Sequence, residues 1–415
     1  MKKRETNSHD HNWHSSEFEE DVNIPHHKFH WDPKQLQSEM PYLSERFSSN
    51  FETSTALDEL RDTVNKIMAT GKSILNCDDS VKLGDLLVRC GLHNNEENRR
   101  RFRNVLFNPQ TLYEDSLGSY VSLVVLGHEA LFQKSGDGQL LRDILTNQGI
   151  LFAIQVDKGS APMYNSSTAS RNEREMIVEG LDDLDKRCLA YRKAGCSATK
   201  VTAVFRVGAE RPSTRAIQDN VRALARFASV CQAYCLVPII ACELASSGDN
   251  DVDKTERAME LILVELMVAL ADQEVLLEAT LVAPNMCTPG RDCTTHASVT
   301  AMACASVLTI RRTIPPAVAG IAFLTTGQDL EEGCVNLDAI SNVKVCKPWP
   351  ITSISGEALL NAVMSVWNGH DSSADKARNE LMKWAMITSL AVRGVFINVE
   401  EESRTESNTE TSAQV

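Results

Sequence analysis

The sequence predicts a (β/α)8 barrel, in which eight parallel strands form a closed sheet surrounded by helices. Three observations support this fold class: eight short apolar runs recur along the chain, most gaps between them have helical periodicity, and the alternating units fill about 330 residues. Near-continuous apolar strands are typical of a parallel sheet covered on its outer face. A doubly wound sheet is the alternative on pattern alone, but no GxGxxG or GxxxxGKS/T motif favours a nucleotide-binding fold.

The eight expected strands are rich in β-branched residues and lie in a regular order along the chain. They are SILNCDD (73–79), VSLVVLG (121–127), ILFAIQVD (150–157), ATKVTAVF (198–205), LVPIIACE (236–243), LLEATLVA (276–283), GIAFLTT (320–326) and PITSISG (350–356). Apolar residues recur at helical spacing in GLDDLDKRCLAYRKAG (180–195), NVRALARFASVCQAY (220–234) and TERAMELILVELMVALADQ (255–273). These segments predict helices that cross between successive strands.

Composition divides the chain into three parts: an extension over 1–50, a barrel over 51–398 and an acidic tail over 399–415. The extension and the tail have little periodic apolar pattern, so we expect both to be disordered. The extension carries six of the ten histidines, which are His9, His11, His14, His26, His27 and His30. Neighbouring histidines could share a metal ion, and a solvated histidine-biased extension is the simpler interpretation.

Charge and cysteine usage narrow the class of protein. The formal net charge of −14 argues against nucleic acid or an anionic membrane surface as the main partner. No apolar segment follows the basic N-terminus, and the apolar run LILVELMVALA (261–271) contains a Glu and is too short to span a bilayer. The twelve cysteines form no CxxC pair and no zinc-ligand cluster. We therefore expect reduced thiols and a cytoplasmic location.

Residues that could carry chemistry stand at the carboxyl ends of the expected strands, because these ends share one mouth in a barrel. The polar candidates there include Asp78, Asp157, Lys200 and Glu243. If Lys200 points inward, it needs acidic neighbours. It would then be either a proton donor or phosphate contact, or the counter-ion of a buried structural network.

Over residues of about 55 to 395 the sequence resembles class I fructose-bisphosphate aldolase. The matching stretches include GKSILNCDDS, NNEENRRRFRNVLF, GHEALFQKSGDG, LARFASVCQAYCLVPII, LEATLVAPNMCTPG, RRTIPPAVAGIAFLTTGQDLEE and KPWPITSISGEALL. The resemblance implies a barrel, a homotetramer, no metal or other cofactor, and cleavage of fructose 1,6-bisphosphate through a lysine Schiff base.

The position of the Schiff-base lysine is altered in this chain. The resemblance implies a lysine directly before Pro-Asn-Met, as in Gly-Thr-Leu-Leu-Lys-Pro-Asn-Met, and here that residue is Ala283. The adjacent Pro284 fixes the register, and no lysine occurs between Lys254 and Lys344. A methyl group cannot attack a ketone to form an iminium ion.

Other family positions are also substituted. The resemblance implies a proton-transferring Glu at Ala241, a substrate-binding Lys at Gln155, a phosphate-binding Arg at Thr202, a Gly at Thr326, a Ser at Ile354 and an Arg at Glu357. An arginine in the first helix and a C-terminal tyrosine are missing as well. Three active-site positions, Asp78, Lys200 and Glu243, are retained, and we interpret them as a charge network needed by the core.

Our first hypothesis is a catalytically inactive paralogue with a binding, scaffold or regulatory role. Its partners would be itself or an active paralogue in a tetramer, or cytoskeletal or other proteins. The alternative is an active glycolytic aldolase, cleaving fructose 1,6-bisphosphate to dihydroxyacetone phosphate and glyceraldehyde 3-phosphate, with Lys200 as the relocated amine. A zinc-dependent aldolase is the third option, but the barrel histidines lack ligand spacing; they are His93, His128, His296 and His370.

Overall fold

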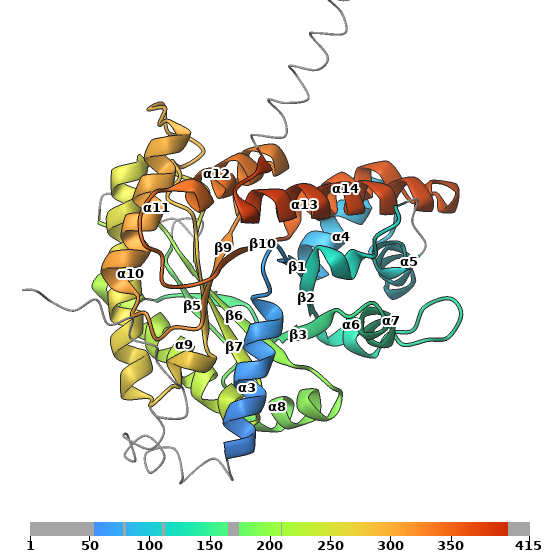
Figure 1. The fold of residues 1–415 in the computed structure, drawn as a ribbon, viewed down its shortest axis with the longest axis horizontal. Coiled ribbons are helices and arrows are strands. Elements are labelled where there is room, and N and C mark those ends of the chain that lie inside the picture. Colours follow the sequence, from blue (N-terminus) through green and yellow to red (C-terminus); the bar gives the residue numbers. More distant parts are fainter. Residues whose placement is uncertain (1–53, 78–79, 110–112, 165–173, 209, 397–415) are drawn as a thin grey trace, which may run out of the picture. The chain divides into compact units, whose positions relative to one another are not determined.

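Eight parallel strands close into a barrel, which confirms the predicted fold (Figure 1). The computed structural model describes residues 54–77, 80–109, 113–164, 174–208 and 210–396. The histidine-bearing extension over 1–50 and the tail after 398 lie outside these residues, so the expectations for them, and the three-part division itself, stay predictions.

The barrel strands follow the order β1-β10-β9-β8-β7-β6-β3-β2, and every neighbouring pair is parallel. Their bounds are β1 Ser73–Asn76, β2 Val121–Leu126, β3 Leu151–Gln155, β6 Ala198–Phe205, β7 Val237–Leu244, β8 Leu281–Pro284, β9 Gly320–Leu324 and β10 Ile351–Ser355. Each expected strand is present. An antiparallel hairpin of β4 (Ser160–Pro162) and β5 (Met176–Val178), which the pattern did not indicate, lies between β3 and β6 in the chain.

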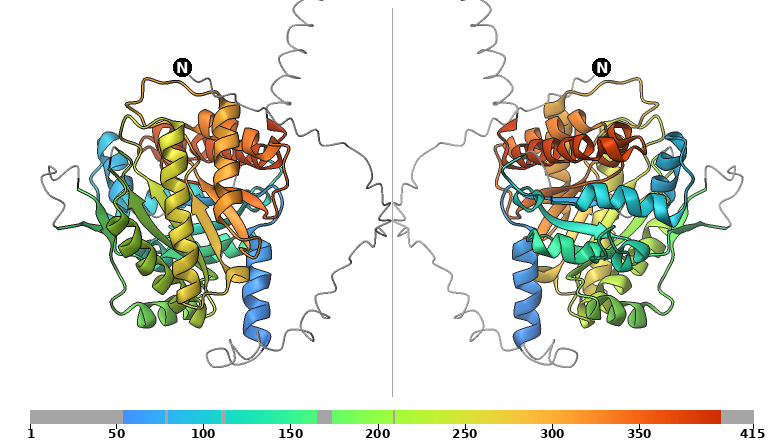
Figure 2. Two further views of the ribbon diagram at one scale, coloured as in Figure 1. Left: turned by 90° about the vertical axis from the view of Figure 1, so that its left-hand side faces the viewer. Right: turned by 90° about the vertical axis from the view of Figure 1, so that its right-hand side faces the viewer.

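Helices surround the barrel (Figures 1 and 2). They are α3 Ser54–Ile67, α4 Ser80–Arg89, α5 Glu96–Phe107, α6 His128–Phe132, α7 Leu141–Asn147, α8 Leu184–Lys193, α9 Thr214–Ala233, α10 Val252–Asp272, α11 Val299–Thr313, α12 Leu330–Asn342, α13 Glu357–Trp367 and α14 Ala374–Arg393. The three predicted helices correspond to α8, α9 and α10. Short 3-10 turns occupy η1 (Leu117–Ser119), η3 (Leu277–Ala279) and η4 (Asp371–Ser373). None of the helices in the described residues is long and apolar enough to cross a membrane.

Strand β8 begins at Leu281, five residues later than the apolar pattern predicts, because the preceding residues form the turn η3. The side chain of Gln232, on α9, holds this turn. Its Oε1 accepts from the backbone N–H of Leu276 at 2.9 Å, and its Nε2 donates to the carbonyl oxygens of Leu276 at 2.8 Å and Ala279 at 3.3 Å. A buried carboxamide that satisfies three backbone groups competes effectively with a strand ladder.

The two faces of each strand have different surroundings. On β6 and β8, Val201, Ala203 and Val282 pack into the main hydrophobic core that the strands share with the helices. Side chains alternate across a strand, so Lys200, Thr202 and Ala283 lie on the opposite face, toward the barrel axis. This assignment of faces determines which residues can take part in chemistry at the mouth.

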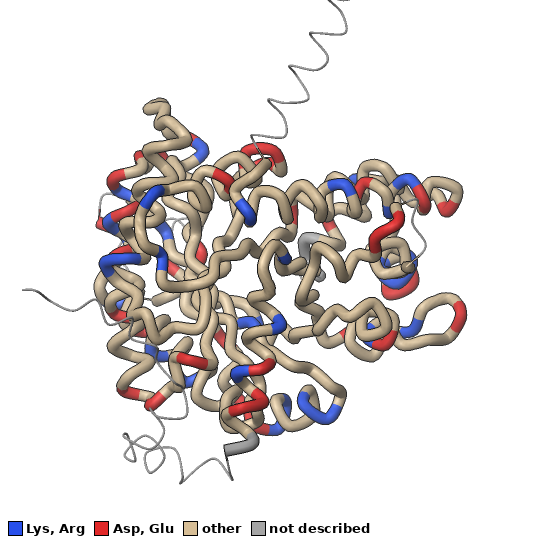
Figure 3. Tube along the Cα trace, viewed as in Figure 1, with Lys and Arg blue, Asp and Glu red and all other residues tan. Residues whose placement is uncertain are grey.

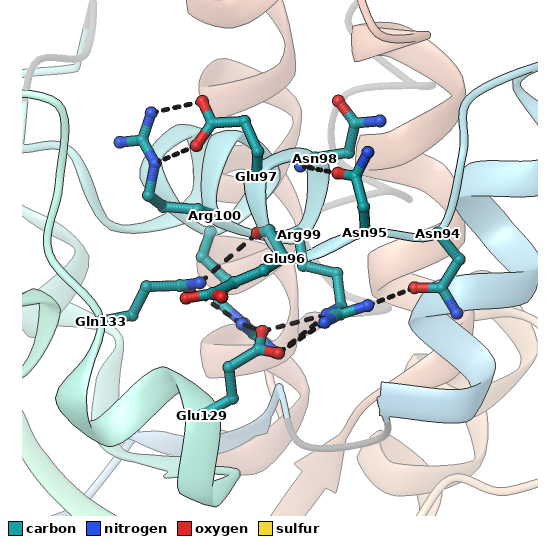
Figure 4. A network of polar contacts seen from close by, with 10 residues as sticks. Asn94, Asn95, Glu96, Glu97, Asn98, Arg99, Arg100, Glu129 and Gln133 are labelled. Atoms are coloured by element: carbon teal, nitrogen blue, oxygen red, sulfur yellow. Dashed lines mark hydrogen bonds and ion pairs between the residues drawn. The ribbon is translucent and has the colours of Figure 1, made fainter.

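Charged residues of both signs are interspersed along the chain trace (Figure 3), and one buried group of them ties α5 to α6 (Figure 4). Glu129 accepts hydrogen bonds from the Nε of Arg99 at 3.0 Å and from its terminal nitrogen at 2.6 Å. Arg103, which is almost fully buried, also donates to Glu129 and to the Oε1 of Gln133 at 2.9 Å. The network joins two of the stretches that carry the family resemblance, and its residues serve packing.

All twelve cysteines lie among the described residues, and all are free thiols. We predict that iodoacetamide at pH 8 labels the exposed Cys304 and Cys346 first. Cys242 and Cys196 stay unlabelled in the native protein, because burial raises the pKa of each thiol to about 12. Peptide mass spectrometry of native and urea-unfolded samples measures the difference. Equal labelling of Cys242 in both samples would contradict the barrel packing.

Candidate active site

Three of the substituted positions form one row across adjacent strands of the barrel. The register pairs Thr202 on β6 with Ala241 on β7, and Ala241 with Ala283 on β8. Register partners in a parallel sheet lie side by side on the same face. Both alanines are fully buried, and the row faces the barrel axis. The inner wall of these three strands therefore offers one hydroxyl and two methyl groups.

Lys200 lies beside this row, buried on the same inner face. Its Nζ donates to the Oγ1 of Thr202 at 2.6 Å and to the Oε1 of Gln155 at 3.2 Å. The Nε2 of Gln155 in turn donates to the carboxylate of Asp157 and to the Oγ1 of Thr202. Two substituted positions, Gln155 and Thr202, thus bind the retained lysine directly.

Asp157 closes this network on the third strand of the barrel. Its Oδ2 accepts from the backbone N–H of Thr202 at 2.9 Å, and its Oδ1 accepts from that of Gly159 at 3.1 Å. Burial raises the pKa of Asp157 above its ordinary value, while the hydrogen bond from Thr202 and the charge of Lys200 act in the opposite direction. The charged groups of this inner wall are therefore already held by other residues of the chain.

The rim after β9 and β10 is bulkier than a bare phosphate-binding loop. Ile354 is buried and pairs in register with Ile74 and Leu324, so it acts as a core residue. Thr326 is half-exposed, and Glu357 is exposed as the first residue of α13. Gly327 has a φ of +84°, and a Cβ there would lie 2.7 Å from Ser246 Cβ, which explains why this glycine remains.

The retained positions are placed only in part. Asp78 lies outside the described residues. Glu243 is half-buried on β7 and alternates with Cys242 and Leu244 of the main core, so it belongs to the inner face with Ala241. Asn285, just after β8, accepts a 2.9 Å hydrogen bond from the backbone N–H of Leu244. It therefore ties the ends of β7 and β8 together.

One polar residue of the inner face escaped the sequence reasoning. Asn76 ends β1, and its neighbour Leu75 packs into the main core, so Asn76 faces inward. Its Oδ1 is buried and has no hydrogen-bond partner. A polar residue at the end of an apolar strand is the signal that would have identified it.

The described residues contain no group of three His, Cys, Asp or Glu side chains that could hold a metal ion. What the inner face offers instead is a lysine, carboxylates, carboxamides and hydroxyls, mostly bonded to one another. Such a set can bind a polar molecule, and Lys200 is its only amine in the described part of the inner row and network.

We predict that Lys200→Met lowers the free energy of unfolding by about 1–3 kcal/mol, because it leaves buried acceptors on Gln155 and Thr202 without their donor. Urea unfolding followed by circular dichroism measures this change. Lys158→Met is the matched control, since Lys158 is exposed two residues after β3 begins to leave the barrel, and its effect should stay within about 0.5 kcal/mol. Equal stability of the Lys200→Met and wild-type proteins would exclude a structural role for Lys200.

Comparison with known proteins agrees with the fold and with the placement of the mouth. The family model for fructose-bisphosphate aldolase class-I matches residues 59–414. A fructose-bisphosphate aldolase from Drosophila melanogaster is 39% identical over 349 residues, covering 84% of this chain and 94% of that protein. Human fructose-bisphosphate aldolase B is 38% identical over 341 residues, covering 82% of this chain and 91% of that protein.

A solved structure supports the same conclusion. The aldolase from Plasmodium falciparum, in a complex with TRAP and a small molecule inhibitor, superimposes with a TM-score of 0.78 at 33% identity, covering 83% of this chain and 96% of that one. With a family model and relatives that each span most of its length, this chain belongs to the class I fructose-bisphosphate aldolase family.

Proposed function

We propose that this protein is an aldolase-family barrel that does not form the Schiff base of its relatives and has a binding, scaffold or regulatory role, in the cytoplasm. The observation that carries the proposal is Ala283, which stands directly before Pro284 at the buried inner end of β8. A covalent iminium intermediate requires an amine there, and a methyl group has no electron pair to supply.

The register adds support, because the changes at the mouth are neighbours in space. Thr202, Ala241 and Ala283 replace, on the resemblance, an arginine, a glutamate and a lysine in one row across three strands. One such change alters specificity. Three adjacent ones remove a nucleophile, a proton-transfer group and an anion contact from a single surface.

The second candidate function is an active fructose-bisphosphate aldolase in glycolysis, and the names of the relatives favour it. In this case the amine would be Lys200, which is buried on the same inner face. Against this candidate, the Nζ of Lys200 already donates to Thr202 and Gln155, and it projects from β6 instead of β8. A carbonyl carbon would have to approach it from a different direction.

Borohydride trapping distinguishes the two candidates. The purified protein is incubated with dihydroxyacetone phosphate, reduced with borohydride and weighed by mass spectrometry. We predict no covalent adduct, and a cleavage rate for fructose 1,6-bisphosphate lower than that of an active relative by a factor on the order of 10⁶, as for other enzymes that lose their nucleophile. The Drosophila relative assayed in parallel is the positive control.

An adduct on wild-type protein that disappears in Lys200→Met would establish relocated Schiff-base chemistry and refute the first proposal. An adduct that survives this substitution would place the amine elsewhere and would refute both. The stability measurement on Lys200→Met shows whether loss of an adduct reflects chemistry or unfolding.

Partners form the second half of the proposal: self-association or assembly with an active paralogue, and binding of cytoskeletal or other proteins. An exposed apolar stripe on two neighbouring helices supports association (Figure 2). On α10, Leu261, Val264 and Val268 are 58%, 47% and 55% exposed, and on the adjacent α11 Leu308 is 38% exposed. The solved Plasmodium falciparum aldolase holds TRAP, which supports a binding role for this fold.

We predict that Leu261→Asp together with Val268→Asp dissociates the oligomer, because each change places a charge in an apolar contact. Light scattering after size-exclusion chromatography measures the mass of the particle against the 45.8 kDa chain. Arg215→Asp on α9, an exposed helix position away from the stripe, is the control. A wild-type protein that elutes as a monomer would contradict this part of the proposal.

A further inference from the structure

Asn76 is a polar side chain of the inner face that the fold leaves unsatisfied. Its Oδ1 is buried and has no hydrogen-bond partner, although buried acceptors are nearly always paired. The residue packs against the rim: a Cβ on Gly356 would lie 3.4 Å from Asn76 Cβ and 3.6 Å from its Nδ2. Asn76 therefore stands next to the turn that leads into Glu357 and α13, at the mouth of the barrel.

The other polar groups around the mouth are mostly neutral. Gln155, Thr202, Thr325 and Thr326 are half-exposed, as is Asn76, and together they come from β1, β3, β6 and the end of β9. Below them, Ala241 and Ala283 form a fully buried apolar floor. A surface of amides and hydroxyls over an apolar floor is suited to a ligand with hydroxyl groups and no formal charge.

The charges argue against an anionic ligand. In the described part of the mouth the carboxylates of Asp157, Glu243 and Glu357 face the single ammonium group of Lys200, so the balance is negative. Each phosphate of a sugar bisphosphate carries a charge of about −1.5 to −2 at pH 7. Two such groups would enter a field of the same sign, and the exposed Glu357 stands at the start of α13, where an anion would otherwise be favoured.

The charges do not favour a cationic ligand either, because the carboxylates are already engaged. Asp157 accepts hydrogen bonds from Thr202, Gly159 and Gln155. Glu357 occupies the first turn of α13, where the helix dipole compensates its charge, and Glu243 has an interaction within the chain. None of them is left as a dedicated counter-ion for a bound amine.

We propose that the mouth binds a small neutral polyol or hydroxy-ketone, of triose to hexose size, and that Asn76 Oδ1 accepts a hydrogen bond from one of its hydroxyl groups. This inference rests on the proposed function, since it describes the ligand of a mouth that has lost its phosphate contacts and its Schiff-base amine. The protein would then sense or hold an unphosphorylated sugar instead of cleaving a phosphorylated one.

Ligand-observed NMR with four probes tests the proposal. The probes are dihydroxyacetone and fructose as neutral ligands, fructose 1,6-bisphosphate as the anion and spermidine as the cation. We expect dihydroxyacetone or fructose to bind at least tenfold more tightly than either charged probe. Asn76→Ala should weaken that binding about five- to tenfold, the loss expected for one hydrogen bond to a buried acceptor.

Two further variants sharpen the result. Asn147→Ala removes an exposed carboxamide on α7 and should leave binding unchanged. Asn76→Ser keeps a shorter acceptor, so it should retain part of the affinity and serves if Asn76→Ala does not fold by circular dichroism. The inference is overturned if the bisphosphate or spermidine binds best, if no probe binds, or if both Asn76 variants bind like wild type.

The fate of this inference is separable from that of the proposed function. A borohydride adduct with dihydroxyacetone would refute the absence of Schiff-base chemistry while leaving the preference for a neutral ligand intact. Tight binding of fructose 1,6-bisphosphate without any adduct would do the reverse: the barrel would be inactive, and the ligand class assigned to it would be wrong.

Discussion

The parallel register of the closed barrel is the constraint on which the rest of the structure depends. Backbone hydrogen bonds fix which residues of neighbouring strands lie side by side, and closure leaves no edge along which a strand could slip. A slip of one residue on β8 would turn Val282 inward and Ala283 outward. Because Val282 packs into the core that the barrel shares with its helices, the apolar contacts hold Ala283 on the inner face.

This constraint explains why the changes at the mouth are consistent with one another. On the resemblance, a lysine at Ala283 would stand beside a glutamate at Ala241, since the two positions are register partners. Losing the lysine alone would leave a buried carboxylate without its partner, at a cost of about 3–5 kcal/mol. Two alanines side by side avoid this cost, because neither needs a hydrogen bond in a fully buried position.

The retained lysine shows the complementary solution. Lys200 keeps its charge in a buried position because Gln155 and Thr202 accept hydrogen bonds from its ammonium group, and Asp157 stands behind them. Both acceptors occupy positions where the resemblance implies a cation. Replacing like charges by neutral acceptors removes repulsion around Lys200 and leaves a compact network that stabilises β3 against β6. An inherited catalytic wall has thus become a wall of paired polar groups.

Sequence alone determined the fold class and the positions of all eight strands, because strand periodicity and helix periodicity are local properties of the chain. It also located Ala283, since Pro284 fixes its place at the end of β8. It placed the start of β8 wrongly, because the turn before it depends on a bond from distant Gln232. Only the tertiary structure decided that Thr202, Ala241 and Ala283 form one row, and that Asn76 has an unpaired acceptor. These features arise from contacts between strands far apart in sequence, which no local pattern records.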